Sequence, residues 1–140
     1  MPTGKLKLMA GDAADLQVIS AAIQDALVAV KDCAFLGDER RFAMLVNRYR
    51  WEAEQVSGQG SRTHAALVFN EVTGVRHRNV PLGQPDRVLE LLAVVEDGPG
   101  TVRLDFAADR SIRLEMARLA CHLEDVGEPW PTPWKPAHPV

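Results

Sequence analysis

The stretch Val88–Asp125 constrains the fold most, because apolar residues recur in it at every second position over three successive segments. Such alternation indicates β-strands that each bury one face. Turn-forming residues at Asp97–Gly100 and Ala108–Arg110 separate the segments. The stretch therefore predicts a three-stranded antiparallel meander, onto which the earlier parts of the chain add further strands.

The alternation slips within the third segment, near Ala117 and Arg118. One extra residue in a strand has this effect, so the slip predicts a β-bulge. A short helix within 117–125 is the alternative interpretation, and the same residues are compatible with both.

The N-terminal part of the chain predicts a short strand followed by a helix. Leu6 and Leu8 alternate with lysines, which is typical of a protected sheet edge. Asp12 is a good N-cap, and the apolar residues Leu16 and Ile19 follow at helical spacing. We therefore expect one amphipathic helix over Asp12–Asp25.

Three more segments have the composition of extended chain: Val28–Phe35, Phe42–Trp51 and Ala65–Arg78. Glu52–Thr63 is rich in Gly, Ser and Gln, and we expect it to form an exposed, flexible loop. The predicted fold is α+β: a mainly antiparallel β roll or partly open barrel of about seven strands, with one N-terminal amphipathic helix packed on it.

The length of 140 residues and the apolar content of 46% fit one globular domain. We place this domain at residues 1–127 and a Pro/Trp-rich tail at 128–140. Five prolines in this tail disfavour a helix or a central strand. Trp130 and Trp134 are large apolar groups, so we expect them to pack on the domain or on a neighbouring subunit.

Two cysteines, Cys33 and Cys121, lie within apolar patterns, which fits buried free thiols in a reducing compartment. The apolar runs are far shorter than the roughly 20 residues of a membrane span, and Asp12 interrupts any signal-peptide core. The sequence predicts a cytoplasmic protein that does not enter a membrane.

The common catalytic and cofactor signatures are missing from the sequence. It has no phosphate-binding Gly-Lys-Ser/Thr loop, Gly-x-Ser-x-Gly elbow, His-Glu-x-x-His pair or Cys-x-x-Cys pair. The histidines, including His138, do not combine with the cysteines at metal-ligand spacing. We therefore predict no catalytic residue, no cofactor and no metal, although an enzyme of unrecognised type remains open.

Two arginine pairs are the best candidates for a binding surface. Arg48 and Arg50 share one face of an expected strand, and Arg76 and Arg78 share one face of another. If these strands were neighbours, the four guanidiniums would suit a phosphate or carboxylate. The full candidate set is Arg48, Arg50, Arg76, Arg78, Tyr49 and Trp51, the two aromatic residues offering a stacking surface.

The alternative interpretation is an ordinary solvated sheet face. In it the arginines pair with acidic residues such as Glu52 and Glu71, and the aromatic side chains lie in the core. Similarly, Arg103 or Arg113 would pair with Glu90 or Asp105 in a cross-strand charge ladder.

The order of segments resembles a bacterial domain family of unknown function, best represented in alphaproteobacteria. The resemblance runs from about Leu6 to Trp130, and its most distinctive parts are Gln24-Asp25-Ala26, Glu39–Phe42 and Asn47–Glu52. It implies a single small bacterial cytosolic domain, and it implies no activity, cofactor or site residue.

Two hypotheses of function follow. The first is a non-enzymatic interaction or assembly module, expected to form a homodimer or to bind a protein partner through the Trp-Pro tail. The second is a domain, or an enzyme of unrecognised type, that holds a small anionic ligand on the arginine-rich face. The net charge of −3 argues against a nucleic-acid partner.

Overall fold

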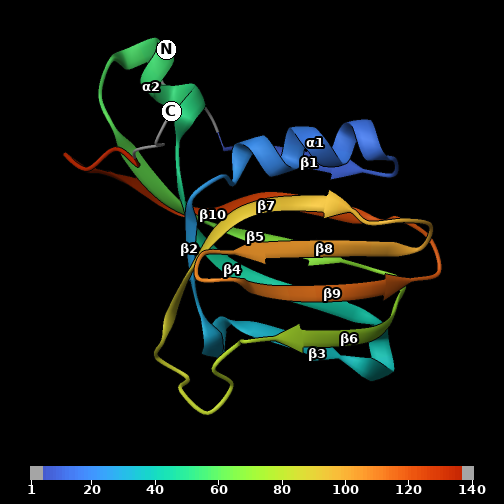
Figure 1. Cartoon of the computed structure of the whole chain (residues 1–140). Coiled ribbons are helices and arrows are strands. Elements are labelled where there is room, and N and C mark those ends of the chain that lie inside the picture. Colours follow the sequence, from blue (N-terminus) through green and yellow to red (C-terminus); the bar gives the residue numbers. More distant parts are fainter. Residues whose placement is uncertain (1–4, 137–140) are drawn as a thin grey trace.

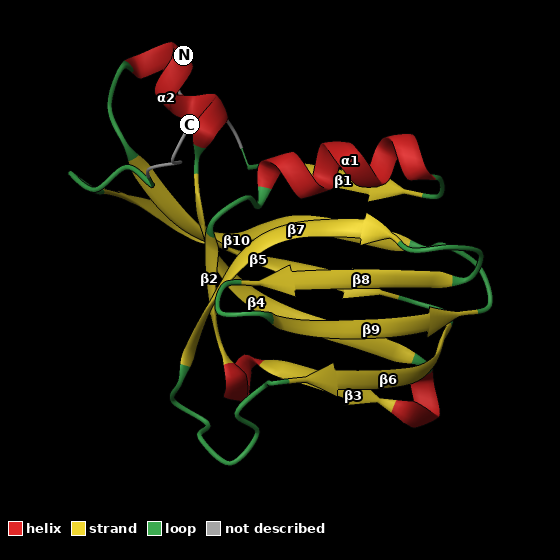
Figure 2. Cartoon of the chain, in the orientation of Figure 1, coloured by secondary structure: helices red, strands yellow, loops and turns green. Residues whose placement is uncertain are grey.

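The computed structural model describes residues 5–136, in which one long antiparallel sheet folds over on itself (Figures 1 and 2). Helix α1 lies along the sheet, and helix α2 projects beyond the ends of the strands (Figure 1). The elements in chain order are β1 (Lys7–Ala10), α1 (Ala13–Ala22), β2 (Ala26–Ala29), the 3₁₀ turn η1 (Val30–Asp32), β3 (Cys33–Leu36), the 3₁₀ turn η2 (Gly37–Glu39), β4 (Arg41–Tyr49), α2 (Trp51–Ser57), β5 (Ser61–Phe69), β6 (Val72–Arg78), β7 (Val88–Glu96), β8 (Thr101–Phe106), β9 (Arg110–Met116) and β10 (Cys121–Pro131).

The ten strands form one sheet in the order β1-β10-β5-β4-β2-β7-β8-β9-β6, with β3 paired to β4. β2 joins the two halves: it meets β4 at one residue pair, Leu27↔Asn47, and β7 at four. The half containing β7, β8, β9 and β6 lies over the half containing β10, β5 and β4 (Figure 1). Within the described residues the outer strands β1 and β6 pair with one neighbour each, so the sheet is not closed.

The core fills the space between the two halves. Alternate residues of the long strands point inward, and side chains such as Phe42, Leu67, Leu91 and Leu104 are almost completely buried. This is the arrangement expected when two twisted sheet layers pack face to face and their inner side chains interdigitate. The predicted meander is confirmed as β7, β8 and β9.

Helix α1 begins where the sequence predicts. The Asp12 side chain accepts a hydrogen bond from the Asp15 amide at 2.8 Å, which is the expected N-cap contact. Leu16 and Ile19 are buried, and the Ser20 hydroxyl accepts a hydrogen bond from the backbone of Val94 in β7. The helix ends at Ala22, three residues before the predicted end.

The count of about seven strands is too low because three predicted strands are each two strands. Turn η1 separates β2 from β3, and Glu71, with φ of 60°, turns the chain between β5 and β6. Neither a bulge nor a helix forms near Ala117: β9 ends at Met116, and Cys121 begins a separate strand that pairs with β1 and β5.

The predicted loop over Glu52–Thr63 is wrong in its first half, which forms α2. The run from Trp51 to Ser57 contains no glycine or proline, and Glu and Gln are good helix formers. Gly58, with φ of 73°, ends the helix in the left-handed conformation that favours glycine.

The predicted tail begins inside a strand. Trp130 and Pro131 continue β10 alongside β5, after a register shift that follows Val126. Beyond the strand, the Thr132 amide donates a hydrogen bond to the Gly60 carbonyl at 3.0 Å. The predicted tail residues 137–140 lie outside the described residues. Within 5–136, neither helix is long and apolar enough to cross a membrane.

Gly60 leaves no room for a side chain between β5 and the chain after β10. A Cβ atom there would lie 2.8 Å from the Thr132 carbonyl oxygen and 2.8 Å from the Tyr49 hydroxyl. We expect Gly60→Ala to lower the free energy of unfolding by about 1–3 kcal/mol, the usual cost of overpacking. Urea unfolding measures this, and Gly83→Ala is the matched control because its Cβ would meet nothing within 4 Å. Equal unfolding midpoints for the two variants would contradict the prediction.

Candidate functional site

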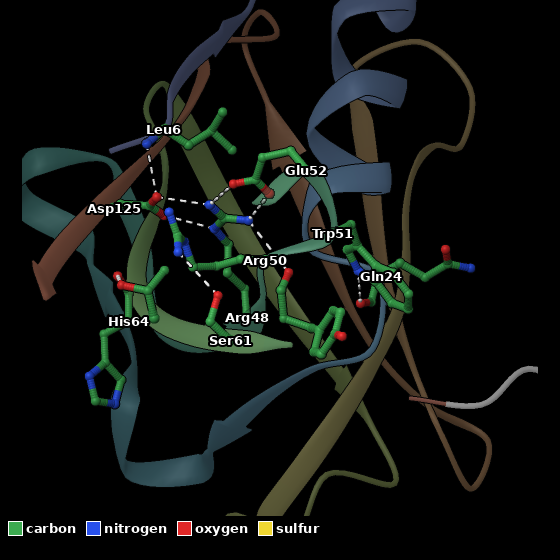
Figure 3. A network of polar contacts seen from close by, with 11 residues as sticks. Leu6, Gln24, Arg48, Arg50, Trp51, Glu52, Ser61, His64 and Asp125 are labelled. Carbon is green, nitrogen blue, oxygen red and sulfur yellow. Dashed lines mark hydrogen bonds and ion pairs between the residues drawn. The ribbon is translucent and has the colours of Figure 1, made fainter. Parts of the chain in front are cut away.

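The Arg48 guanidinium is completely buried and is held by two carboxylates (Figure 3). Its Nε and Nη2 donate to the two oxygens of Asp125 at 2.7 and 2.8 Å. Its Nη1 and Nη2 donate to the two oxygens of Glu52 at 2.8 and 2.9 Å. The Leu6 amide also donates to Asp125, at 2.8 Å. One side chain thus connects β4, α2, β10 and the chain that enters β1.

The protonation of this cluster follows from these contacts. Burial favours the neutral form of Asp125, but the hydrogen bonds from Arg48 and from the Leu6 amide outweigh burial and hold the pKa of Asp125 below its usual value. Burial likewise opposes the charge on Arg48, and the hydrogen bonds to Asp125 and Glu52 overcome it, so the pKa of Arg48 is raised. Burial favours the neutral form of Glu52 as well, and its hydrogen bonds from Arg48 outweigh burial and lower its pKa. All three groups are therefore ionised at neutral pH, and all five N–H groups of Arg48 already have acceptors, the fifth being the Tyr49 carbonyl at 3.5 Å.

The other residues of the predicted Arg48–Trp51 motif also make contacts within the protein. The Tyr49 ring is buried, its hydroxyl donates to Glu54 at 2.7 Å, and its centroid is 4.7 Å from that of Trp51. The Trp51 indole donates to the Gln24 carbonyl, and Arg50 donates to the Ser61 hydroxyl at 3.1 Å. Because Tyr49 is enclosed, it offers no stacking face for a base.

The structure does not bring Arg48 and Arg50 together with Arg76 and Arg78. Strand β4 does not pair with β6. In the sheet order, β6 is the last strand and β4 lies in the interior. Arg48 points to the inner side of β4, in the same alternation as the buried Phe42. Arg76 and Arg78, by contrast, lie on the solvent side of β6, with 77% and 68% of their side chains exposed.

Arg76 and Arg78 instead line a surface hollow with three arginines from β8 and β9. The hollow has a volume of about 500 Å³, and we call it the arginine hollow. Its arginines are Arg76, Arg78, Arg103, Arg110 and Arg113.

The centre of the arginine hollow is a row of three like charges. Arg76 is the register partner of Arg113, and Arg113 is the partner of Arg103, so the three lie directly beside one another on neighbouring strands. Like charges in directly opposed positions destabilise a sheet. The positive charge of this row must therefore be neutralised by acidic residues or by a bound anion.

Acidic residues neutralise the row in part. Asp97 lies 3.0 Å from Arg103 and 2.9 Å from Arg113, and Asp105 accepts two hydrogen bonds from Arg103. Asp105 therefore pairs with Arg103 along strand β8 and not across strands, so the predicted cross-strand ladder is wrong for this pair. Glu90 makes no ion pair among the residues the structure describes.

The remaining arginines of the hollow have weaker partners. Arg76 lies 3.4 Å from Glu115, and Arg78 lies 3.2 Å from Asp109 in a largely exposed pair. Arg110 donates to the Asn79 carbonyl and, within residues 5–136, has no carboxylate partner. Partial burial lowers the pKa of His77, which also lines the hollow, so this residue is neutral at pH 7 and adds no positive charge.

The two tail tryptophans differ. The Trp130 ring is partly buried, with its centroid 4.9 Å from that of His64 on β5. Trp134 is 80% exposed. Trp130 thus contacts the domain, whereas Trp134 does not pack on it within residues 5–136. The alternative that Trp134 packs on a neighbouring subunit stays a prediction.

Neither cysteine is placed to act as a nucleophile. Burial raises the pKa of Cys33 to about 11 and that of Cys121 to about 12, so both are protonated thiols at pH 7. In the described part of the chain, the acidic residues, histidines and cysteines form no group of three that would hold a metal ion. His138 lies outside that part.

Comparison with known proteins identifies the family. Residues 6–138 match the family described as protein of unknown function (DUF2948). The chain belongs to this family. No curated protein matches it, and no solved structure does. The family carries no assigned activity, so the function must be argued from the geometry of this domain.

Sequence reasoning named Arg76 and Arg78 as candidates for the site and did not place Arg103, Arg110 and Arg113 beside them. Arg103 and Arg113 alternate with buried residues, so their outward direction was readable. Their alignment with Arg76 was not readable, because it depends on β6 pairing with β9 across 31 intervening residues that form β7, β8 and their connections.

Breaking the Arg48 cluster should strongly destabilise the fold. Arg48→Met leaves Asp125 as a buried charge without its main partner, and we expect the free energy of unfolding to fall by about 3–5 kcal/mol. Urea unfolding at pH 7 measures this. Arg118→Met is the control, because Arg118 is exposed and has no ion pair in the described part of the chain; a similar loss in both variants would contradict a special role for Arg48.

The contribution of Asp125 should disappear in acid. The folded pKa of Asp125 lies below its ordinary value of 3.8, so the unfolded chain takes up the proton first as pH falls. The stabilisation is complete above the unfolded pKa and is lost as pH falls through the folded one. We expect the stability difference between the native protein and Arg48→Met to shrink as the pH falls below the ordinary value of 3.8 and through the lower, folded pKa. A difference that stays constant over this range would show that the ion pair is not its source.

Proposed function

We propose that this protein binds a small anion, through a phosphate or carboxylate group, in the arginine hollow. The observation that carries the proposal is the register row of Arg103, Arg113 and Arg76 inside a hollow of about 500 Å³. Guanidinium groups present flat pairs of N–H donors that match the oxygens of carboxylates and phosphates.

The charge balance of the hollow supports an anionic ligand. Five arginines and two aspartates, Asp105 and Asp109, are among its lining residues, which is a formal excess of three positive charges. Asp97 and Glu115 pair with these arginines from outside the lining and reduce the excess to one. The whole chain has a net charge of −3, so this face is a local exception that would attract anions.

The partners of the arginines also leave room for a ligand. Arg103 is held by Asp97 and Asp105, and it forms a fixed part of the site. Arg76 and Arg78 have only exposed ion pairs, which contribute little to stability and exchange readily with a bound anion. Within the described residues Arg110 bonds only to a backbone carbonyl, so it keeps most of its donors available there.

The interaction-module hypothesis has weaker support. Trp134 is an isolated exposed side chain, and much of the predicted tail belongs to β10 or contacts β5. The expected homodimer, the protein partner and the cytoplasmic location stay predictions.

Titration with simple anions tests the proposal. We expect phosphate and pyrophosphate to bind at low ionic strength, as measured by calorimetry, and their affinity to fall as salt is added. Arg76→Ala should weaken binding about tenfold or more, since a hydrogen bond to a charged group contributes about 1.5–3 kcal/mol. Arg76→Lys keeps the charge and loses the paired donors, so its affinity should lie between those of the native protein and Arg76→Ala.

The control is Arg118→Ala, which removes an exposed arginine that does not line the hollow. It should bind pyrophosphate as the native protein does. If the Arg76 and Arg118 variants lost the same affinity for pyrophosphate, the anion would be attracted by the net charge of the protein rather than bound at a site. Absence of binding by the native protein at low salt would refute the proposal.

A further inference from the structure

A second, apolar hollow lies on the inner side of β6. It has a volume of about 200 Å³, and its lining includes Phe35, Phe42, Val80, Leu82 and Ile112. We call it the apolar pocket. It lies between β3 and β4 on one side and β6 and β9 on the other, where the sheet stays open because β6 pairs only with β9 in the described chain.

His77 belongs to both hollows. It lines the apolar pocket together with Ile112 and the arginine hollow together with Arg76 and Arg78. The two hollows are therefore separated by one strand, and that strand is an edge. Within 5–136 this strand pairs with no strand other than β9. One end of its free side is bonded, by the Val72 amide to the Arg40 carbonyl at 2.8 Å, and the part around His77 has no such bond in the described chain, so a flexible ligand can pass over it there from one hollow to the other.

The apolar pocket is surrounded by apolar side chains that remain in contact with water. Leu82 is 60% exposed and Phe35 is 41% exposed, and both line the pocket. Single exposed apolar residues are common, but two beside one pocket form a surface that an apolar group would cover favourably.

We propose that the ligand of this protein is an amphipathic anion, with its phosphate or carboxylate head in the arginine hollow and an apolar tail in the apolar pocket. The inference rests on the proposed anion binding and adds the class of ligand. A pocket of about 200 Å³ holds roughly six or seven chain atoms, at about 30 Å³ for each water-sized group. The charge of the arginine hollow selects the head, and the pocket limits the length of the tail.

A series of n-alkyl phosphates, used below their micelle concentrations, tests this inference by calorimetry. Affinity should rise about fourfold for each methylene that becomes buried, the usual value for transfer out of water. The rise should level off near six or seven carbons, when the pocket is full. Inorganic phosphate provides the reference for the head alone.

Two variants test the binding of the anionic head and of the apolar tail separately. Leu82→Ser changes an exposed pocket residue, so it should reduce the dependence on chain length and leave the affinity for inorganic phosphate unchanged. Arg76→Ala should weaken every member of the series by a similar factor. Val56→Ser is the matched control, because Val56 is 68% exposed and lies on α2 away from both hollows.

The outcomes distinguish the two proposals. Affinity that depends on Arg76 but not on chain length would overturn the amphipathic ligand and leave anion binding intact. Affinity that rises with chain length but ignores Arg76→Ala would overturn the proposed anion site, and with it this inference. A chain-length effect that is equal in Leu82→Ser and Val56→Ser would place the tail outside the apolar pocket.

Discussion

The fold depends on a positive charge placed at the end of its core. Arg48 follows Phe42, Met44 and Val46 on the inner side of β4, in a position where an apolar residue would continue the pattern. Burying a guanidinium is unfavourable unless every donor finds an acceptor. Asp125 and Glu52 accept from four of the five N–H groups, and the Tyr49 carbonyl accepts from the fifth. Because the two carboxylates come from β10 and α2, the charge holds together segments that are distant in the chain.

Arginine has opposite roles at the two ends of this molecule, and the direction of the side chain decides between them. Arg48 faces inward, is saturated by carboxylates and contributes to structure. Arg76 and Arg78 face outward from the edge strand β6, and Arg110 begins the neighbouring strand β9; their partners are exposed or uncharged. The same contrast explains why the proposed ligand site lies at β6: a sheet that does not close leaves a charged outer face and an apolar inner face on either side of one strand.

Much of the secondary structure was readable from local patterns, and the errors have common causes. The meander and the capped helix follow from period-2 alternation and from Asp12, which act over a few residues. Strands were merged where a turn contains no glycine or proline, as at Glu71, which adopts a positive φ as a non-glycine residue. Helix α2 was missed because Gly58 and Gly60, which follow it, give the whole segment the composition of a loop.

The sequence by itself determined which residues alternate inward and outward, and hence a mainly antiparallel α+β domain with a helix after Asp12. Only the tertiary structure decided which outward residues meet. Arg76 and Arg113 are 37 positions apart, and they are neighbours only because β6 pairs with β9 rather than with β4. Local periodicity encodes the face of a strand on which a side chain lies. Strand order is set by how all the apolar faces are buried together, and no single segment contains that information.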